Sequence, residues 1–561
     1  MKRLFKKCMA LLLAALIIFS AVPLGVLAIE TYAATYSGKC GENLIWTLNE
    51  DTGELSINGT GNMLNWSTRE QVPWHNKRIK TISISDGVTS IGDNAFSLST
   101  VKSINFGNTI VEIGDYAFDL CDGLSEVVLP DSLKTIGEYA FADCYNLSKV
   151  LLGKSLTTIG YAAFSWCNSI SSVFIPKDVE FIDEAVFASC FNLSNIDVDI
   201  SNAFYSSDES GVLFNKNKTA LIQYPIGKKQ AKYTVPDSVT TVGNASFLNS
   251  QNLENIVIGN NVSKIGVRAF SGCSELTNIV LGKSVKEIEF AAFEGCYYLM
   301  DVSFGDSVLS IGPQAFKSCQ NLREVNISSS VKDIAVEAFS DCFSLQKFNV
   351  SADNRYYFSD STGVLYNKDK TTLICYPCGN NTTNYSILPE TTHIEAYAFY
   401  GVQNLKNLTI PKNIKNVGDY ALLRINSDYD SKPFENIYFD GTIEEWNRLI
   451  PEDEYFIYTD NITFTASVAY NDKITAKFFS FPTSIDDFSI LWTTKNSIKL
   501  SPSNNLLGCS AILSDIGKIT ITSTIKDKNS TFAHSTNYHF TVEYTWWQWI
   551  IVILLFGWIW Y

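Results

Sequence analysis

The chain has few of the residues from which catalytic and metal sites are usually built. Its 561 residues include four histidines, and none has the spacing of a metal-binding pair or stands near a nucleophile motif. It has no glycine-rich phosphate-binding loop and no pair of carboxylates in a special context. We therefore expect no catalytic residue, no bound cofactor and no metal site, and nothing positive indicates an enzyme.

Basic residues are scarce relative to acidic ones. The chain contains 43 lysines and arginines against 58 aspartates and glutamates, which gives a formal net charge of −15. Nucleic-acid-binding domains need a basic footprint, so we expect no nucleic acid among the partners. The charges are spread along the chain rather than gathered in blocks, which indicates a soluble surface.

One six-residue phrase returns along most of the chain. It reads Ile-Gly-Asp-Asn-Ala-Phe in its first copy, and the step from one copy to the next is almost always 23 residues. The copies start at Ile91, Ile113, Ile136, Ile159, Ile182, Val242, Ile265, Ile288, Ile311, Ile334, Ile394 and Val417. A fixed period of about 20–50 residues indicates a solenoid of stacked coils.

Each unit begins with the pattern of a short strand. In one copy Leu124, Val127 and Leu129 are apolar, and Pro130 then ends the strand. The second apolar set, which includes the repeated phrase, has mixed spacing that suits a short helix or a turn. No single unit can bury this much apolar surface. We therefore expect coils stacked about 4.8 Å apart, with their strands paired in a parallel sheet and one continuous core.

Two similar segments, residues 211–225 and 363–377, interrupt the repeats. Each reads as strand, polar turn, strand, which is typical of a β-hairpin. We therefore predict a solenoid of about twelve 23-residue coils over residues 81–424, with hairpin insertions at 204–233 and 356–385.

Eight of the thirteen cysteines form a column, each three residues after the phenylalanine of its unit. They are Cys121, Cys144, Cys167, Cys190, Cys273, Cys296, Cys319 and Cys342. We interpret the column as a structural ladder of small buried residues. Disulfides between coils are the alternative in an exported protein, although parallel side chains suit disulfide geometry poorly. Cys375 and Cys378 have the spacing of a redox or zinc half-site, but their place in a repeated hairpin favours a structural role.

Both ends of the chain are apolar. Residues 1–28 combine basic residues, an apolar run and small residues, which predicts a signal peptide and an exported protein, at the cell surface or extracellular. Residues 546–561 are uncharged and rich in tryptophan. As a helix they would span about 24 Å, less than the ~30 Å hydrocarbon core. We favour a membrane-seated anchor or an export signal, hence membrane or envelope association, over a last strand of the preceding domain.

Segments without repeats flank the solenoid. Residues 29–80 read as strands and turns that cap the first coil, because an open solenoid end exposes core and strand edges. Residues 425–465 are predicted as the C-terminal cap. Residues 466–545 show short alternating strands, which predicts a small all-β domain, an immunoglobulin-like sandwich acting as a stalk.

The repeat Leu-x-x-Ile-x-Ile-Pro-x-Ser-Val-x-x-Ile-Gly-x-x-Ala-Phe-x-x-Cys-x-Asn resembles that of the BspA-like leucine-rich repeat family of bacterial surface proteins. The resemblance covers residues 81–424. The segment that begins at Cys40 is similar to a cap that often precedes such arrays, and residues 441–446 to a segment that often follows them. The resemblance implies a leucine-rich-repeat-type fold, surface display or secretion, and adhesion to host matrix or other cells. It implies no enzyme activity and names no ligand.

Outward positions of the strands indicate where a partner would bind. Alternation turns Val128, Leu151 and Phe174 outward in three adjacent units, and Val257 and Val280 in two later ones. A contiguous exposed apolar strip is a candidate protein-binding site, although such residues also simply suit strands. We expect a macromolecule of a host or neighbouring cell as the partner, a protein or alternatively a glycan. The alternative function is a non-adhesive structural spacer of the cell envelope, and the sequence does not indicate an oligomeric state.

Overall fold

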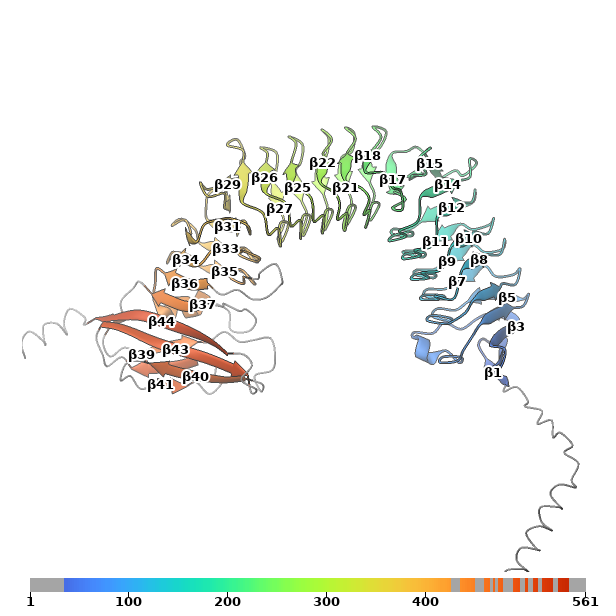
Figure 1. Ribbon diagram of the computed structural model, residues 1–561, viewed down its shortest axis with the longest axis horizontal. Helices are drawn as coiled ribbons and strands as arrows, with labels where there is room; N and C mark the ends of the chain where they lie inside the picture. Colours follow the sequence, from blue (N-terminus) through green and yellow to red (C-terminus); the bar gives the residue numbers. More distant parts are fainter. Residues whose placement is uncertain are drawn as a thin grey trace, which may run out of the picture.

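The computed structural model describes residues 35–424 and 434–449 and, beyond them, only separate strands between 459 and 543. The predicted signal peptide at 1–28 and the apolar tail at 546–561 lie outside the described residues. Figure 1 shows the stacked coils curving into an arch, with β1 (Thr35–Lys39) at one foot and the last strands at the other. Within the described part of the chain, no helix has the length and apolar character needed to cross a bilayer.

Each coil contributes strands to two parallel ladders rather than to one. The first ladder contains β4 (Thr81–Ile84), β6 (Ser103–Asn105), β8 (Glu126–Val128), β10 (Lys149–Leu151), β12 (Ser172–Ile175), β14 (Asn195–Val198), β18 (Lys232–Thr234), β20 (Asn255–Val257), β22 (Asn278–Val280), β24 (Asp301–Ser303), β26 (Glu324–Ile327), β28 (Lys347–Val350), β32 (Asn384–Ser386) and β34 (Asn407–Ile410). The second contains β5 (Val88–Ile91), β7 (Glu112–Ile113), β9 (Thr135–Ile136), β11 (Thr158–Ile159), β13 (Phe181–Ile182), β19 (Thr241–Val242), β21 (Lys264–Ile265), β23 (Glu287–Ile288), β25 (Ser310–Ile311), β27 (Asp333–Ile334), β33 (His393–Ile394) and β35 (Asn416–Val417). The period fixes the register, so that Leu151 lies opposite Val128 and Ile159 opposite Ile136.

The repeated phrase continues beyond the second ladder as a wound turn, with a hydrogen-bond ladder of its own. The amides of Tyr116 and Phe118 donate to the carbonyls of Glu138 and Ala140 in the next coil, at 2.9 and 2.7 Å. To aim its amide in this way, Tyr116 adopts a left-handed conformation with φ of 55°. The same position has positive φ in every copy of the phrase, although a left-handed non-glycine residue costs roughly 1–2 kcal/mol. The bonds between coils offset that cost.

The core runs along the axis of the stack. Phenylalanines of successive coils lie ring on ring, with centroids 5.1–5.8 Å apart from Phe96 to Phe187 and 4.6–5.5 Å apart from Phe247 to Phe339. Buried valines, isoleucines and leucines of the two ladders surround them. Because each ring stacks on its neighbours, the aromatic column stabilises the stack beyond the burial of apolar surface, through contacts that depend on ring orientation.

Antiparallel strands close the N-terminal end. β1 pairs with β2 (Asn43–Asn49), which pairs with β3 (Glu54–Asn62), and β3 runs parallel to β4 and β5. Trp46, Trp66 and Trp74 pack edge to face in this cap, and Trp74 stacks on Phe96 of the first coil. A 3-10 turn, η1 (Arg69–Gln71), precedes Trp74. The cap therefore covers the aromatic column that the first coil would otherwise expose.

The two predicted hairpins are turns of the solenoid as well as hairpins. In the first, β15 (Tyr205–Ser207), β16 (Leu213–Asn215) and β17 (Ala220–Gln223) pair antiparallel, and β17 then pairs parallel with β19. In the second, β29 (Tyr357–Ser359), β30 (Leu365–Asn367) and β31 (Thr372–Cys375) repeat this arrangement, and β31 pairs with β33. The hairpin coils therefore count as turns in addition to the twelve that carry the repeated phrase, and the solenoid as a whole has about 16 turns.

The stack bends at both hairpins. Figure 1 shows the arch changing direction near β15–β17 and again near β29–β31. Leu221 of the hairpin coil lies opposite Val242. The step from Leu221 to its stacking residue Tyr224 is only three residues, whereas the step from Val242 to Phe247 is five. A hairpin coil therefore lacks two residues of the wound turn. The hairpin coil is therefore narrower on the side of the wound turns, and the stack bends toward that side.

Beyond the repeats, the first ladder continues into the C-terminal strands. β34 pairs with β36 (Phe434–Phe439), which pairs with β37 (Thr459–Phe464). β37 in turn pairs with β44 (Ala533–Glu543), and β38 (Val468–Ala469), β40 (Phe488–Thr494) and β43 (Gly517–Asp527) complete this sheet. A second sheet contains β39 (Lys473–Lys477), β41 (Leu500–Pro502) and β42 (Gly508–Ile512). A short helix, α2 (Ile443–Leu449), packs Trp446 against Phe439. The immunoglobulin-like character of residues 466–545 stays a prediction.

Candidate functional site

The predicted apolar strip lies on the outer face of the first ladder. On β8, β10 and β12 the residues Val127, Val150 and Val173 point into the core, so that the next residue on each strand points out. The outward side chains are Val128, Leu151 and Phe174, which are 53%, 46% and 54% exposed. Three neighbouring coils thus present one row of apolar side chains at the same register, a few ångströms apart.

Ion pairs between successive coils border this row. The Lys149 ammonium pairs with the Glu126 carboxylate two residues before the apolar position. The Lys154 ammonium lies 2.6 Å from the Asp131 carboxylate on the turn that follows, and it lowers the pKa of that carboxyl. An apolar centre with a polar rim is the usual composition of a protein–protein interface.

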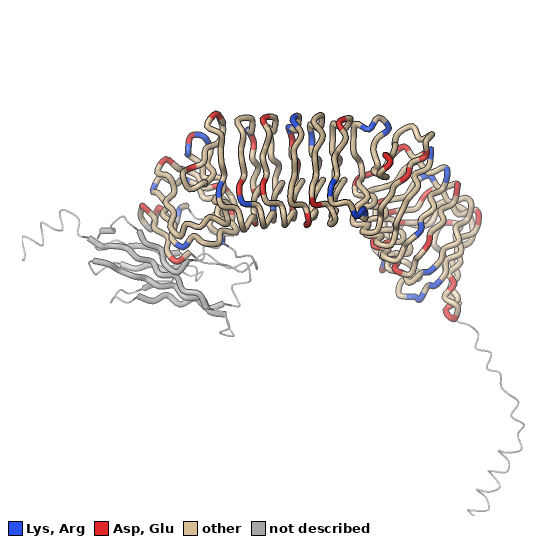
Figure 2. The backbone as a smooth tube through the Cα atoms, turned by 45° about the horizontal axis from the view of Figure 1, so that its top comes forward, with Lys and Arg blue, Asp and Glu red and all other residues tan. Residues whose placement is uncertain are grey.

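The same column continues unevenly along the arch. Val257 and Val280 are Cα partners on β20 and β22 and are 40% and 48% exposed. Ser303 and Asn326 then follow at the same register, and the amide of Asn349 donates to Asn326 at 3.0 Å. The apolar surface is therefore two separate patches, and the patch near the N-terminus has the larger side chains. Figure 2 shows acidic and basic residues interspersed along the coils around them.

The cysteine column lies inside the solenoid, beside the aromatic column. Each of its eight thiols is buried, and each Sγ donates to the phenylalanine carbonyl of the preceding coil at 3.1–3.3 Å. Burial raises the pKa of Cys190 and Cys273 to about 12, so that these thiols stay protonated. The cysteines within the described residues are free thiols. In this arrangement they act as packing and hydrogen-bonding groups.

Cys375 and Cys378 take different places in the second hairpin coil. Cys378 is buried and donates to the carbonyl of Tyr400 at 3.2 Å, whereas Cys375 is half-buried and borders a cavity. His75 and His393 lie in different parts of the stack, while the side chains of His534 and His539 are outside the described residues. Among the residues that the structure describes, no three His, Cys, Asp or Glu side chains converge as metal ligands.

The cavity beside Cys375 is a feature that the sequence reasoning missed. It has a volume of about 410 Å³ and lies where the second hairpin coil lacks part of the wound turn. The three-residue step from Leu373 to Tyr376, against five from Ile394 to Phe399, is the signal that marks it in the sequence.

One protein-family model matches most of the chain. The model of the BspA type leucine rich repeat region matches residues 71–208, 229–363 and 374–490, in six copies. No curated protein matches the chain significantly.

Several solved structures are similar in fold. A leucine-rich repeat protein from Eubacterium ventriosum is 24% identical, with a TM-score of 0.51 over 69% of this chain and 94% of that chain. A leucine-rich cell surface protein from Faecalibacterium prausnitzii is 23% identical, with a TM-score of 0.45 over 56% of this chain and 95% of that chain. The pneumococcal vaccine antigen PcpA is 17% identical, with a TM-score of 0.44 over 76% of this chain and 98% of that chain.

Proposed function

The chain belongs to the BspA-type leucine-rich repeat family, and from this premise we propose that it is an exported surface protein that binds a macromolecule of a host or neighbouring cell. The signal peptide predicted at residues 1–28 supports export. Solenoids of stacked repeats present extended surfaces for binding, and leucine-rich repeat solenoids typically serve as scaffolds for protein interactions.

The observation that carries the proposal is the row formed by Val128, Leu151 and Phe174. Their side chains are about half exposed, whereas the residue before each of them on its strand is buried. Removing such side chains from water contributes roughly 25 cal/mol per Å² of apolar surface. A partner that covers the row would therefore gain binding energy without rearranging the solenoid, and the ion pairs at its border would remain solvated.

A screen of immobilised matrix proteins, mucins and glycans tests this function. The purified mature chain is compared with the triple variant Val128→Asp/Leu151→Asp/Phe174→Asp. The matched control is Ser303→Asp/Asn326→Asp/Thr409→Asp, which adds the same charge at the same repeat position on distant coils. Equal thermal unfolding of all three chains shows that the fold is kept.

Binding by the parent and the control, with loss in the triple variant, would support adhesion through the apolar row. Equal binding by all three chains would keep adhesion and remove the row as its site. Absence of binding in every case would favour the second candidate, a structural spacer of the envelope. The polar outward residues Ser303 and Asn326 favour that reading for the middle of the arch.

A further inference from the structure

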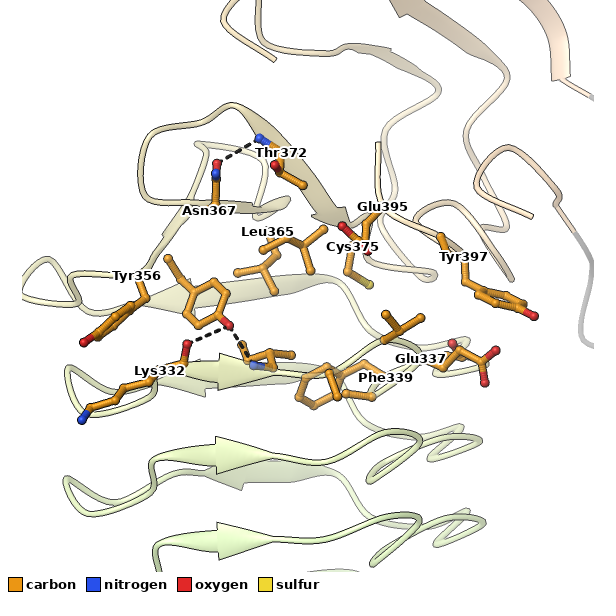
Figure 3. A pocket seen from close by; sticks show the side chains of 18 residues that line it. Lys332, Glu337, Phe339, Tyr356, Leu365, Asn367, Thr372, Cys375, Glu395 and Tyr397 are labelled. Carbon is orange, nitrogen blue, oxygen red and sulfur yellow. Dashed lines mark hydrogen bonds between the residues drawn. The ribbon is translucent and has the colours of Figure 1, made fainter. Parts of the chain in front are cut away.

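The cavity at the second hairpin has a structural origin that can be traced. Figure 3 shows it between the coil of Phe339 and the coil of Tyr397, with Cys375 of the hairpin coil at its base. The hairpin coil separates these two coils but lacks two residues of the wound turn. The space that those residues fill elsewhere in the stack is therefore left open. Its volume of about 410 Å³ lies within the usual range of ligand pockets.

The first hairpin coil has the same shortage, but its flanking coils meet across it. The Asn244 amide donates to the Glu184 carboxylate at 2.5 Å, and the Asn249 amide donates to the Ser189 hydroxyl at 2.8 Å. Alanines that include Ala185 pack beneath these bridges.

At the second hairpin the bridging residues are replaced. Ala396 and Gly401 stand at the positions of Asn244 and Asn249, and Val336 stands at the position of Glu184. Neither bridge can form with these side chains. At the second junction the flanking coils meet instead at Glu337 and Tyr397, where burial and the Glu337 carboxylate raise the pKa of the Tyr397 hydroxyl to about 12, and the cavity remains beside this contact.

The walls of the cavity combine an apolar floor with an acidic and aromatic end. Phe339, Leu365 and Ile374 contribute apolar surface. Figure 3 shows Glu337 and Tyr397 at one end, Lys332 and Tyr356 at the other, and Glu395 beside Cys375 between them.

The two carboxylates of the cavity wall differ in their partners. Glu337 is held by Gln314, whose amide donates to it at 2.5 Å, and by Lys317, whose ammonium lies 3.7 Å away. The half-buried carboxylate of Glu395 has no pairing group among the described residues. The cavity thus offers one unpaired negative charge beside apolar surface.

We propose that this cavity binds a lysine or arginine side chain of a partner polypeptide. The alkyl stem packs on Phe339 and Ile374, as basic side chains commonly lie along apolar surface. The cation meets the Glu395 carboxylate, which attracts it by charge and accepts its hydrogen bond. The site is distinct from the apolar row of β8, β10 and β12, and its test does not depend on that row.

Calorimetric titration of the full chain tests the proposal. The probe is the capped peptide acetyl-Ala-Lys-Ala-amide, and the comparison peptide carries acetyl-lysine, which keeps the stem and removes the charge. We expect the lysine peptide to bind at least tenfold more tightly than the acetylated one. Glu395→Gln should weaken binding by about 10- to 150-fold, the loss expected for a charge-assisted hydrogen bond.

The repeat supplies a matched control. Glu289 occupies the same place in its unit as Glu395, two coils before the cavity begins, and pairs with Lys264 at 2.7 Å. Glu289→Gln should therefore leave binding unchanged. A second variant, Val336→Glu/Ala396→Asn, introduces the bridging pair found at the first hairpin and should close the cavity and abolish binding with the fold kept.

Two results would overturn the proposal. Equal affinity for the lysine and acetyl-lysine peptides would show that the cation is not recognised, and absence of binding by a folded parent would remove the site. A third arm uses the free diamine cadaverine. Binding of cadaverine without binding of the peptide would contradict the proposal that the bound cation belongs to a polypeptide. Weaker binding of cadaverine than of the peptide would support that proposal.

Discussion

The indole nitrogen of Trp74 donates a hydrogen bond to the carbonyl oxygen of Ala95 at 2.8 Å. In the coils that follow, a phenylalanine amide supplies the equivalent donor, as Phe96 does for Ala117 at 2.7 Å. The ring of Trp74 also stacks on Phe96, with centroids 5.5 Å apart. The coil of Phe96 has no regular coil before it, and the Trp74 side chain of the cap takes the place of that coil's phenylalanine. It supplies both the aromatic ring and the hydrogen-bond donor.

Substitution Trp74→Phe should separate these two roles, because it keeps an aromatic ring and removes the donor. The buried carbonyl of Ala95 would lose its partner, and we expect the free energy of unfolding to fall by about 1–3 kcal/mol. Chemical denaturation measures this loss, and amide exchange should accelerate first in the coil of Phe96. The control is Trp46→Phe, since the buried indole nitrogen of Trp46 has no acceptor. Equal losses in the two variants would contradict the capping role.

Tyrosine hydroxyls close the two breaks in the second ladder. The Tyr205 hydroxyl accepts from the Ile182 amide at 2.8 Å, and the Tyr357 hydroxyl accepts from the Ile334 amide at 2.7 Å. Tyr205→Phe should cost about 1–2 kcal/mol, because the amide is left unpaired in a closed junction. Tyr357 borders the cavity, where water can replace the hydroxyl, so Tyr357→Phe should cost less. Thermal and urea unfolding of both variants checks the order, and the reverse order would contradict this account.

The buried thiols predict a loss of stability at alkaline pH. Burial raises the pKa of Cys190 and Cys273 from 9.0 to about 12, so the folded chain keeps both protonated after the unfolded chain has begun to ionise. Their contribution to the free energy of unfolding is complete below pH 9.0. It falls between pH 9.0 and about 12, by up to about 1.4 kcal/mol per pH unit for each thiol. Denaturation from pH 8 to 11 should show a shallower decline in Cys190→Ala/Cys273→Ala. An unchanged slope would show that other groups cause the decline.

The cavity predicts which thiol reacts first. Cys375 is half-buried at the cavity, whereas Cys378 three residues later is buried. Burial raises the pKa of Cys375 to about 12, so alkylation by iodoacetamide at pH 8 should be slow and should favour Cys375 over Cys378. Peptide mapping of the folded chain after partial reaction measures the ratio. Equal labelling, as expected of the unfolded chain, would contradict the assignment.

Much of the stack follows from the sequence because the period fixes which residues lie above one another. Once Leu151 is aligned with Val128, alternation places Val127 inside and Val128 outside. The same period aligns each Phe and Cys with its counterparts. These relations need only the repeat and the strand geometry.

Other features of the structure could not be predicted from the sequence, for physical reasons. The strand Thr135–Ile136 is too short to give an alternating pattern, so the second ladder could not be separated from the turn. The left-handed conformation of Tyr116 and Ala162 has no chemical marker, because hydrogen bonds to the next coil impose it against local preference. The cavity depends on Ala396 and Gly401 failing to bridge a gap, and such an absence is visible only beside Asn244 and Asn249 of the other junction.

The two short coils also determine the curvature of the whole molecule. Within each run of regular coils the phenylalanine rings stay stacked, and the planes of neighbouring rings differ by 1–19°. Figure 1 shows the coils between β18 and β27 as a nearly straight beam, and each hairpin coil is a wedge that sets an angle between two such segments. Gain or loss of 23-residue units between the wedges would change the span of the arch and keep its angles. Loss of a wedge would open the arch, so span and curvature can vary independently among chains built on this plan.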